Sequence, residues 1–414
     1  MLGRLGTGVL AAGASQVLPR TVAAQGRPPV GRIVDVQSLG ADSSGREDSA
    51  PALQRAIDEV APTGGIIYLP AGRYRIARTL VWQNRGTGRA PGITFQGDGM
   101  HSTVLLSAIG SGPVLRVRGT PSSAPAGTTF FWGGGLRDLT IEGGNGGPEQ
   151  HGLDVLGWYY GEIENCNFVR LGGDGIRATV DLELNANPDV TSSDLFVRGV
   201  WFERLGGWGF RDMSEVQGAP AWLWDRCVFA LCRAGGALVR SSSHSFTKCS
   251  FSGCGWQDER SPAAQVAYGL FFDGSATTSS KQWVEGCEFD ANLTAHIGAR
   301  FLTSSTIVGN RFIFNDRFGR GRINPPVGIE IGSGDAGARV LGVAFQRNFF
   351  RFDIPGQVVV FDFANSANVR DVEISGSVFS EVRPSDVTRY RGQDPAGRGA
   401  AYGFVITDRP REGG

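Results

Sequence analysis

A short motif that ends in phenylalanine recurs along most of the chain and constrains its fold more than any other feature. The motif is a small residue, any residue and then Phe, as in 227–229 and 249–251. Its phenylalanines are Phe168, Phe202, Phe229, Phe251, Phe289, Phe312, Phe350 and Phe379, separated by 34, 27, 22, 38, 23, 38 and 29 residues. A minimum spacing near 22 residues is what a chain needs to wind once around three short strands and return about 4.8 Å higher.

We therefore predict an all-β fold: a single-stranded right-handed parallel β-helix solenoid of about ten coils with an N-terminal capping α-helix. Residues at the same position in successive coils stack, so the phenylalanines should form one interior file, with Ile141 and Phe95 as earlier, more degenerate members. The longer spacings then mark loops that leave the coils. A β-propeller would repeat every ~40–50 residues, which is too long for the shortest units.

The chain divides into three parts by composition. Residues 1–26 combine an apolar stretch with small residues where a signal peptidase would cut, so we expect an export signal or a disordered N-terminus and a secreted or periplasmic protein. Residues 27–383 should form the β-helix, with a cap over 33–82 that contains a helix at 49–61, and coils over about 90–383. Residues 384–414 contain several Pro and Gly and should form a C-terminal cap or a loose tail.

Charge and hydropathy exclude two classes of partner. Lys plus Arg and Asp plus Glu both number 40, so the chain has no basic excess for binding nucleic acid. After the first residues no stretch approaches the ~18 uninterrupted apolar residues of a membrane span. We expect no nucleic-acid partner and no membrane span.

The N-terminal block resembles a known family. The matching segments are 36–41, the helix entry 45–61, the Gly-Gly-Ile-Ile-Tyr-Leu-Pro-Ala-Gly-Arg-Tyr run at 64–74, and the strand at 93–99. They are similar to the N-terminal module of the pectate-lyase-like superfamily, which occurs in polysaccharide-degrading β-helix enzymes and phage tailspikes. The resemblance implies the fold and a polysaccharide ligand, but several reactions share the module. The polygalacturonase pattern is matched only by 173–176, since its Asp-Asp pair and its His are missing, which disfavours that hydrolysis.

Candidate catalytic residues follow from the alternation of side chains along strands. The residues expected to point outward are Asp154, Arg177, Arg211, Val239, Phe271 and Glu330, the first three on consecutive coils about 5 Å apart. Because paired guanidinium groups bind the carboxylate of an acidic sugar, we assign Arg177 and Arg211 to that role. Asp174 or Asp212 would then transfer protons or hold a metal ion. The alternative is a surface ladder of structural ion pairs.

Further residues are candidates for binding the substrate. Aromatic rings can stack on sugar rings, and several lie in the same coils, although alternation would bury about half of them and Trp222 and Trp224 can be core. The insertion between the phenylalanines at 251 and 289 adds the charged run 258–260, with His244 on a nearby coil. The assigned substrate-binding residues are Asp154, Trp158, Tyr160, Trp208, Trp256, Asp273 and Lys281. No His or Cys spacing matches a zinc site, and Ca2+ is the cofactor that we consider.

Six cysteines in an exported chain suggest disulfides. Cys227 with Cys249, and Cys232 with Cys254, lie one 22-residue coil apart, and stacked side chains that point in parallel are poorly placed for a bridge. We expect buried thiols at 166, 227, 249 and 287 and, if any disulfide forms, a bridge between Cys232 and Cys254.

These features predict an exported β-helix enzyme that acts on an acidic, uronic-acid-containing polysaccharide by lyase-type elimination. Two alternatives remain: a glycoside hydrolase of the same fold, and a non-catalytic protein that binds carbohydrate or belongs to a surface structure. A phage tailspike is disfavoured by the export-like N-terminus.

Overall fold

The computed structural model describes residues 32–83, 89–119, 130–144, 146–179, 192–213, 221–258, 261–262, 266–274, 280–318, 325–332, 338–353, 358–364, 369–380 and 386–390. The expected export signal at 1–26 lies outside these residues. No helix among them is long and apolar enough to cross a membrane.

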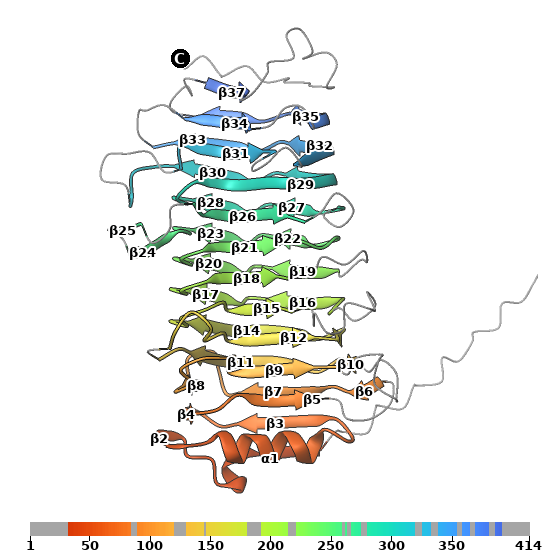
Figure 1. Ribbon diagram of the computed structural model, residues 1–414, viewed down its shortest axis with the longest axis vertical. Coiled ribbons are helices and arrows are strands. Elements are labelled where there is room, and N and C mark those ends of the chain that lie inside the picture. Colours follow the sequence, from red (N-terminus) through yellow and green to blue (C-terminus); the bar gives the residue numbers. More distant parts are fainter. Residues whose placement is uncertain are drawn as a thin grey trace, which may run out of the picture.

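The chain forms a right-handed parallel β-helix whose strands join into one 32-stranded sheet (Figure 1). Each coil contributes strands to three faces, and the coils stack along the long axis of the molecule. Face 1 holds β1 (Arg32–Asp35), β3 (Gly65–Leu69), β7 (Ile93–Gly97), β16 (Leu195–Arg198), β19 (Trp222–Asp225), β22 (Ser245–Thr247), β27 (Trp283–Glu285), β32 (Arg339–Gln346) and β35 (Val369–Ser375).

The second and third faces follow in chain order within each coil. Face 2 holds β2 (Ser44–Asp48), β4 (Gly72–Ile76), β8 (Thr103–Ser107), β17 (Trp201–Glu203), β20 (Val228–Ala230), β23 (Ser250–Ser252), β28 (Glu288–Asp290), β30 (Arg311–Phe314), β33 (Phe349–Phe352) and β36 (Val378–Ser380). Face 3 holds β5 (Leu80–Gln83), β9 (Leu115–Arg118), β12 (Leu153–Leu156), β15 (Ile176–Ala178), β18 (Trp208–Asp212), β21 (Gly235–Val239), β26 (Tyr268–Asp273), β31 (Val327–Ile331), β34 (Val359–Phe363) and β37 (Asp386–Tyr390).

The remaining strands connect faces or lie beside them. β11 (Gly135–Glu142) and β14 (Glu162–Val169) run from face 1 into face 2, and β29 (Ala295–Val308) runs from face 3 into face 1. A small parallel side sheet consists of β6 (Arg89–Pro91), β10 (Phe130–Trp132) and β13 (Trp158–Tyr159), and β24 (Trp256–Asp258) pairs with β25 (Ser261–Pro262) in an antiparallel hairpin. The pairing of β37 with β34 extends the coils past residue 383.

The recurring phenylalanines form the interior file that the sequence predicts. Neighbouring rings stack along face 2, with centroids 5.3 Å apart for Phe168 and Phe202 and 4.7 Å apart for Phe229 and Phe251. Their strand register is continuous through Phe168, Phe202, Phe229, Phe251, Phe289, Phe312, Phe350 and Phe379. Ile141 precedes them in the same file, whereas the prediction for Phe95 is wrong, because Phe95 lies on face 1 in register with Leu136.

The glycines that open the strands of face 3 have a steric cause. A Cβ atom placed on Gly175 would lie 2.5 Å from a ring carbon of Phe202, and one on Gly209 would lie 2.5 Å from a ring carbon of Phe229. Real carbon atoms do not approach so closely, so any side chain here would displace the stacked ring. The Phe file and the glycine turn are therefore two parts of one packing arrangement.

One end of the solenoid is covered by the predicted helix. α1 (Ala50–Val60) follows the short 3-10 helix η1 (Val36–Leu39), and it begins with Pro51 in its first turn, where the missing N–H costs no hydrogen bond. Its apolar side buries Leu53, Ile57 and Val60 against the first coil. The helix thus removes from water the core that an open first coil would expose.

The cysteines are all free and buried. The predicted bridge between Cys232 and Cys254 is therefore wrong: both thiols point into the core, where each donates to a backbone carbonyl of the neighbouring coil. Burial raises the pKa of the Cys166 thiol to about 12, so this thiol stays protonated and unreactive. Trp222 and Trp224 are also core residues, and their rings stack on each other.

Candidate functional site

Charged side chains line the outer surface of face 3 near the N-terminal end. Asp154 pairs in register with Arg177, and Arg177 pairs with Arg211, as predicted, and Arg116 precedes them on β9. The prediction that Val239 continues this outward column is wrong, because Val239 is buried and Leu238 occupies the position next to Arg211. Leu238 and Phe271 therefore interrupt the charged column after β18, and a charged residue returns to it only at Glu330.

The turns that precede β12 and β15 add three polar side chains to this surface. His151 is buried, and its Nδ1 accepts a hydrogen bond of 2.8 Å from the backbone N–H of Asp174. With Nδ1 as the acceptor, the neutral ring carries its proton on Nε2, which lies 3.2 Å from Glu149 Oε2. The hydrogen bond from His151 lowers the pKa of the Glu149 carboxyl, so Glu149 is ionised at neutral pH.

Carboxylates and cations alternate along this surface at short distances. Arg116 Nε and Arg177 Nη2 lie 3.5 Å and 3.4 Å from Asp154 Oδ2. Arg177 Nη1 lies 3.4 Å from Glu149 Oε2. We call the set the charged strip; in spatial order it is Arg116, Asp154, Arg177, Glu149, His151, Asp174 and Arg211.

Asp174 is the most unusual member of the strip. Its Oδ1 accepts the backbone N–H of Trp208 at 2.8 Å, whereas its buried Oδ2 has no hydrogen-bond partner and lies 3.4 Å from His151 Nδ1. Burial raises the pKa of Asp174, which outweighs the effects of the backbone N–H and the nearby cations. Because Asp174 Oδ2 makes no hydrogen bond to Arg211, that guanidinium can still bind an anionic ligand.

Arg211 is the guanidinium that is most available to such a ligand. Its side chain is 38% exposed, against 20% for Arg177, and its nearest carboxylate oxygen is Asp174 Oδ2 at 3.9 Å. Arg177 has both terminal nitrogens engaged by carboxylates. Of the two arginines that were predicted to bind a sugar carboxylate, Arg177 is thus held by ion pairs within the protein, and Arg211 is open to a ligand.

Asp212, predicted to be catalytic, is a core residue. Alternation along β18 turns Arg211 outward and Asp212 inward, where it is buried. Its Oδ2 accepts the Ser241 hydroxyl at 2.5 Å and two backbone N–H groups, and the same hydroxyl lies 2.9 Å from His244 Nε2. This buried network has no path to a substrate, so Asp212 and His244 are structural.

The aromatic candidates divide into core and surface. Trp158 is fully buried, with its Nε1 donating to Gly133 O, and Trp256 is buried in a small cluster with Phe318, so neither can stack on a sugar. Trp208 is half-buried at the start of β18, beside the strip, and Tyr160 is 45% exposed. Tyr160 and Trp208 stay candidates for substrate binding.

The remaining candidates lie away from the charged strip. Asp273 ends β26, two strands beyond β18 on face 3, where Arg240 and Arg300 bind its two oxygens. Lys281 is exposed at the turn before β27, which belongs to face 1. In the run 258–260 only the backbone of residue 258 is described. The strip and these residues do not form one site.

The donor atoms of the strip do not form a metal site. Within the described ranges, no group of three His, Cys, Asp or Glu side chains is arranged to hold a metal ion. The strip carboxylates instead face guanidinium and imidazole groups. The expected Ca2+ therefore has no fitting ligand set here, and we derive no step through it.

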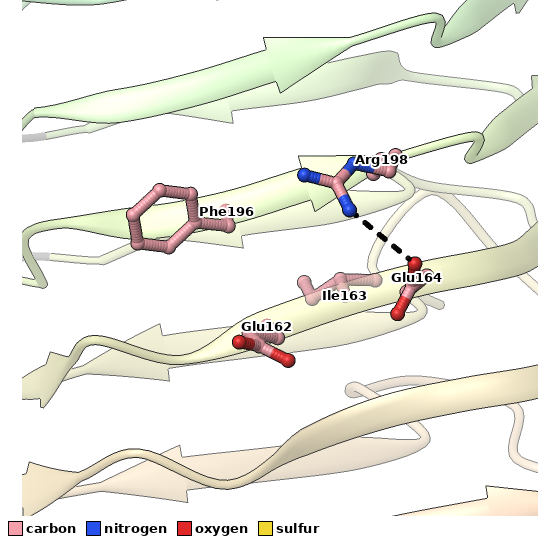
Figure 2. A pocket seen from close by; sticks show the side chains of 5 residues that line it. All are labelled: Glu162, Ile163, Glu164, Phe196 and Arg198. Atoms are coloured by element: carbon pink, nitrogen blue, oxygen red, sulfur yellow. Dashed lines mark ion pairs between the residues drawn. The ribbon is translucent and has the colours of Figure 1, made fainter.

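Shallow hollows occur on another surface, the outer side of face 1. Figure 2 shows one of about 220 Å³, in which Phe196 and the ion pair between Arg198 and Glu164 lie over adjacent coils. A second hollow of about 330 Å³ continues over β19 and β22. Neither contains a residue of the charged strip.

Sequence reasoning missed Glu149, His151 and Arg116. Only the stacking of coils brings them next to Asp154 and Asp174, which come from different turns and strands. A signal was present: residues 149–151 directly precede the Gly152 turn, so the register of the glycines would have placed them beside residues 173–174.

Comparisons with known proteins agree with this architecture. A family model described as "Rhamnogalacturonase A/epimerase, pectate lyase-like" matches residues 33–256, more than half of the chain. The matched segment contains α1, the first coils and the whole charged strip. It confirms the resemblance to pectate-lyase-like proteins that the sequence indicates.

Individual relatives match shorter parts. "Mannuronan C5-epimerase AlgE1" of Azotobacter vinelandii is 32% identical over 152 residues, which are 36% of this chain and 10% of that protein. "Alginate lyase 7" of the same organism is 31% identical over 134 residues, 32% of this chain and 15% of that protein. The chain thus spans a small part of these relatives. The A-module of A. vinelandii mannuronan C-5 epimerase AlgE4 has the same fold, with a TM-score of 0.58 at 17% identity over 88% of this chain and 98% of that chain.

Proposed function

This chain belongs to the rhamnogalacturonase A/epimerase, pectate lyase-like family, and we propose from that premise that it is an enzyme acting on a uronic-acid-containing polysaccharide. The proposal rests on one observation: the exposed guanidinium of Arg211 lies on the same surface as a hydrogen-bonded pair, Glu149 and His151. Sequence relatives named as alginate lyase and mannuronan C5-epimerase support alginate as the first polymer to test.

The chemistry begins with removal of the C5 proton of a uronic acid. Arg211 neutralises the sugar carboxylate, which stabilises the negative charge that develops beside it. The C5–H bond breaks and the proton moves to Glu149, whose carboxylate form is favoured by the hydrogen bond from His151 Nε2. Asp174 holds the His151 ring in place through its backbone N–H.

Elimination then completes a lyase reaction. The electron pair of the broken C5–H bond forms a double bond between C4 and C5, the bond from C4 to the glycosidic oxygen breaks, and Glu149 returns its proton to that oxygen. No oxidant or further reactant is needed. Epimerisation shares the first step but returns a proton to the opposite face of C5, and the epimerases among the relatives make it the second candidate.

We propose that the protein acts outside the cytoplasm, as a secreted or periplasmic protein. This location fits both the expected export signal and a polysaccharide substrate. The expected division into a β-helix at 27–383 and a C-terminal cap or tail at 384–414 also stays a proposal, except that β37 adds a coil strand beyond residue 383.

One panel of assays separates the candidates. The protein is incubated with alginate, polygalacturonate and a neutral polysaccharide, and the ultraviolet absorbance of unsaturated products is followed. A lyase produces absorbance from a uronic acid polymer. An epimerase produces none but incorporates solvent deuterium at C5 without shortening the polymer, which NMR detects. New reducing ends without absorbance would indicate a hydrolase, and binding without any reaction would indicate a carbohydrate-binding protein; either result overturns the proposal.

Variants connect the activity to the strip. Arg211→Ala and Glu149→Gln should each lower kcat/KM at least ~100-fold, a usual effect of removing a group that stabilises charge or transfers a proton. Arg311→Gln is the matched control, because Arg311 pairs with Glu288 at 3.4 Å on face 2, away from the strip. Equal activity of Arg211→Ala and the parent would exclude the assigned role.

A further inference from the structure

Aromatic side chains gather on the small side sheet that adjoins face 3. β13 follows β12 after one residue, Gly157, so the strand that carries Asp154 leads directly to this sheet. β10 lies beyond the arrowhead end of β9 in Figure 1, and β6 pairs beside it. We call the side chains that meet here the aromatic platform: Arg89, Phe130, Trp132, Tyr159 and Tyr160.

The platform presents ring surface to solvent although its rings pack together. Trp132 is 39% exposed and Tyr160 is 45% exposed, whereas most large aromatic residues of the solenoid are fully buried. The ring centroid of Trp132 lies 4.6 Å from that of Tyr160, and it stacks at 6.1 Å on Tyr159. Contacts among the rings fix their orientation, so little side-chain entropy is lost when a ligand binds.

A guanidinium group completes the platform. The Cζ atom of Arg89 lies 4.1 Å from the centroid of the Trp132 ring, which is the geometry of a cation–π contact. Across the part of the chain that the structure describes, no carboxylate forms an ion pair with Arg89. Its state therefore differs from that of Arg177 in the charged strip, whose terminal nitrogens face carboxylates.

We propose that the aromatic platform is a distal subsite for an acidic sugar, in which Arg89 binds the carboxylate and Trp132 with Tyr160 contacts the apolar face of the pyranose ring. A guanidinium that lies over a ring face still has N–H groups free at its edge, and these can bind a carboxylate with two hydrogen bonds. The combination of ring and cation selects a uronic acid over a neutral sugar. This inference rests on the proposed function for the identity of the polymer.

The position of the platform suits one polymer chain that occupies both surfaces. Tyr160 follows Asp154 by six positions in the chain, so at ~3.3 Å per extended residue the two lie at most ~20 Å apart. A few sugar units of an extended polysaccharide span that distance. Oligosaccharides too short to reach the platform should then bind only at the strip.

Binding as a function of chain length tests the subsite. The parent protein and the variants Arg89→Gln, Trp132→Ala and Tyr160→Ala are compared by calorimetry with uronic acid oligomers of two or three units and of eight or more. We expect each variant to lose at least ~10-fold in affinity for the long oligomers and to bind the short ones like the parent. Trp201→Ala is the control, because Trp201 is 43% exposed on face 2. Circular dichroism confirms that each variant is folded.

The outcomes separate this inference from the proposed function. Equal affinity of the Arg89→Gln and Trp132→Ala variants and the parent for long oligomers would overturn the subsite, even if the protein is an active lyase. Loss of long-oligomer binding in these variants would support the subsite, even if no reaction occurs. If the parent binds long neutral oligosaccharides as tightly as uronic acid oligomers, the assigned role of Arg89 is wrong.

Discussion

Two histidines of this molecule each lie near an aspartate and have opposite surroundings. His244 is fully buried, accepts from Trp224 Nε1 at Nδ1 and meets the Ser241 hydroxyl at Nε2. His151 is equally enclosed on its Nδ1 side, but its Nε2 contacts Glu149, whose side chain is 64% exposed. The difference shows that contact with one exposed, charged neighbour, and not burial of the ring itself, distinguishes a candidate catalytic histidine from a structural one.

The largest expected effect is on activity. His151→Gln should lower kcat/KM on the polymer that the parent turns over by ~100-fold or more, because a flexible amide cannot accept from the Asp174 N–H and donate to Glu149 in the fixed positions of the ring nitrogens. His244→Gln should leave the kcat/KM of the folded protein unchanged. Steady-state kinetics on both variants, corrected for folded fraction, measures the contrast. Similar losses in both would remove the distinction between the two histidines.

The second effect is on stability against acid. Burial lowers the pKa of His244 to about 4 and that of His296 to about 3. Between these values and the ordinary pKa of 6.5 the unfolded chain binds protons that the folded protein does not, so the free energy of unfolding falls as the pH is lowered through this window.

Urea unfolding at several pH values between about 7 and 4 measures this dependence. His244→Gln should show a shallower decline than the parent, and the difference between the two curves isolates His244 from the carboxylates that also titrate. Parallel curves would show that His244 is protonated in the folded protein.

Periodicity was sufficient to predict the interior of the fold, because a stacked file repeats one residue type at one position. Phe229 and Phe251 stack as expected, and α1 lies where the N-terminal block predicts a cap. Membership of the file could not be assigned correctly where the repeat is degenerate: Ile141 belongs to the file and Phe95 does not. Assigning the strand register requires a spacing that recurs from coil to coil, and the first coils lack one.

The outer surface was harder to predict, since a site there depends on the strand register and on which side chains of each strand point outward. Arg177 and Arg211 follow their glycines directly, and their pairing was correct. Asp212 was assigned to the site although alternation after Arg211 turns it inward. The alternation of inward and outward side chains also starts anew after each turn, which is why Trp158 proved to be a core residue. His151 becomes part of a site only through a turn on the next coil.

The third prediction compares an inward with an outward aspartate. Asp212→Asn should lower the free energy of unfolding by about 1–3 kcal/mol, because an amide cannot accept all three hydrogen bonds that reach Oδ2 in a buried site. Urea unfolding at neutral pH measures the change. An unchanged midpoint would show that the buried network relaxes around the amide.

The smallest effect on stability is expected from the outward partner, Asp154→Asn. Arg116 is 34% exposed and Arg177 keeps its ion pair with Glu149, so neither cation is left both buried and unpaired, and the free energy of unfolding should change by no more than ~1 kcal/mol. The same variant releases Nη2 of Arg177, which can then contact the substrate carboxylate, so KM should change more than stability does. Kinetics and urea unfolding on one preparation compare the two quantities. A stability loss as large as that of Asp212→Asn would mean that the charged strip is chiefly a structural ladder of ion pairs, and it would weaken the case for a binding surface on face 3.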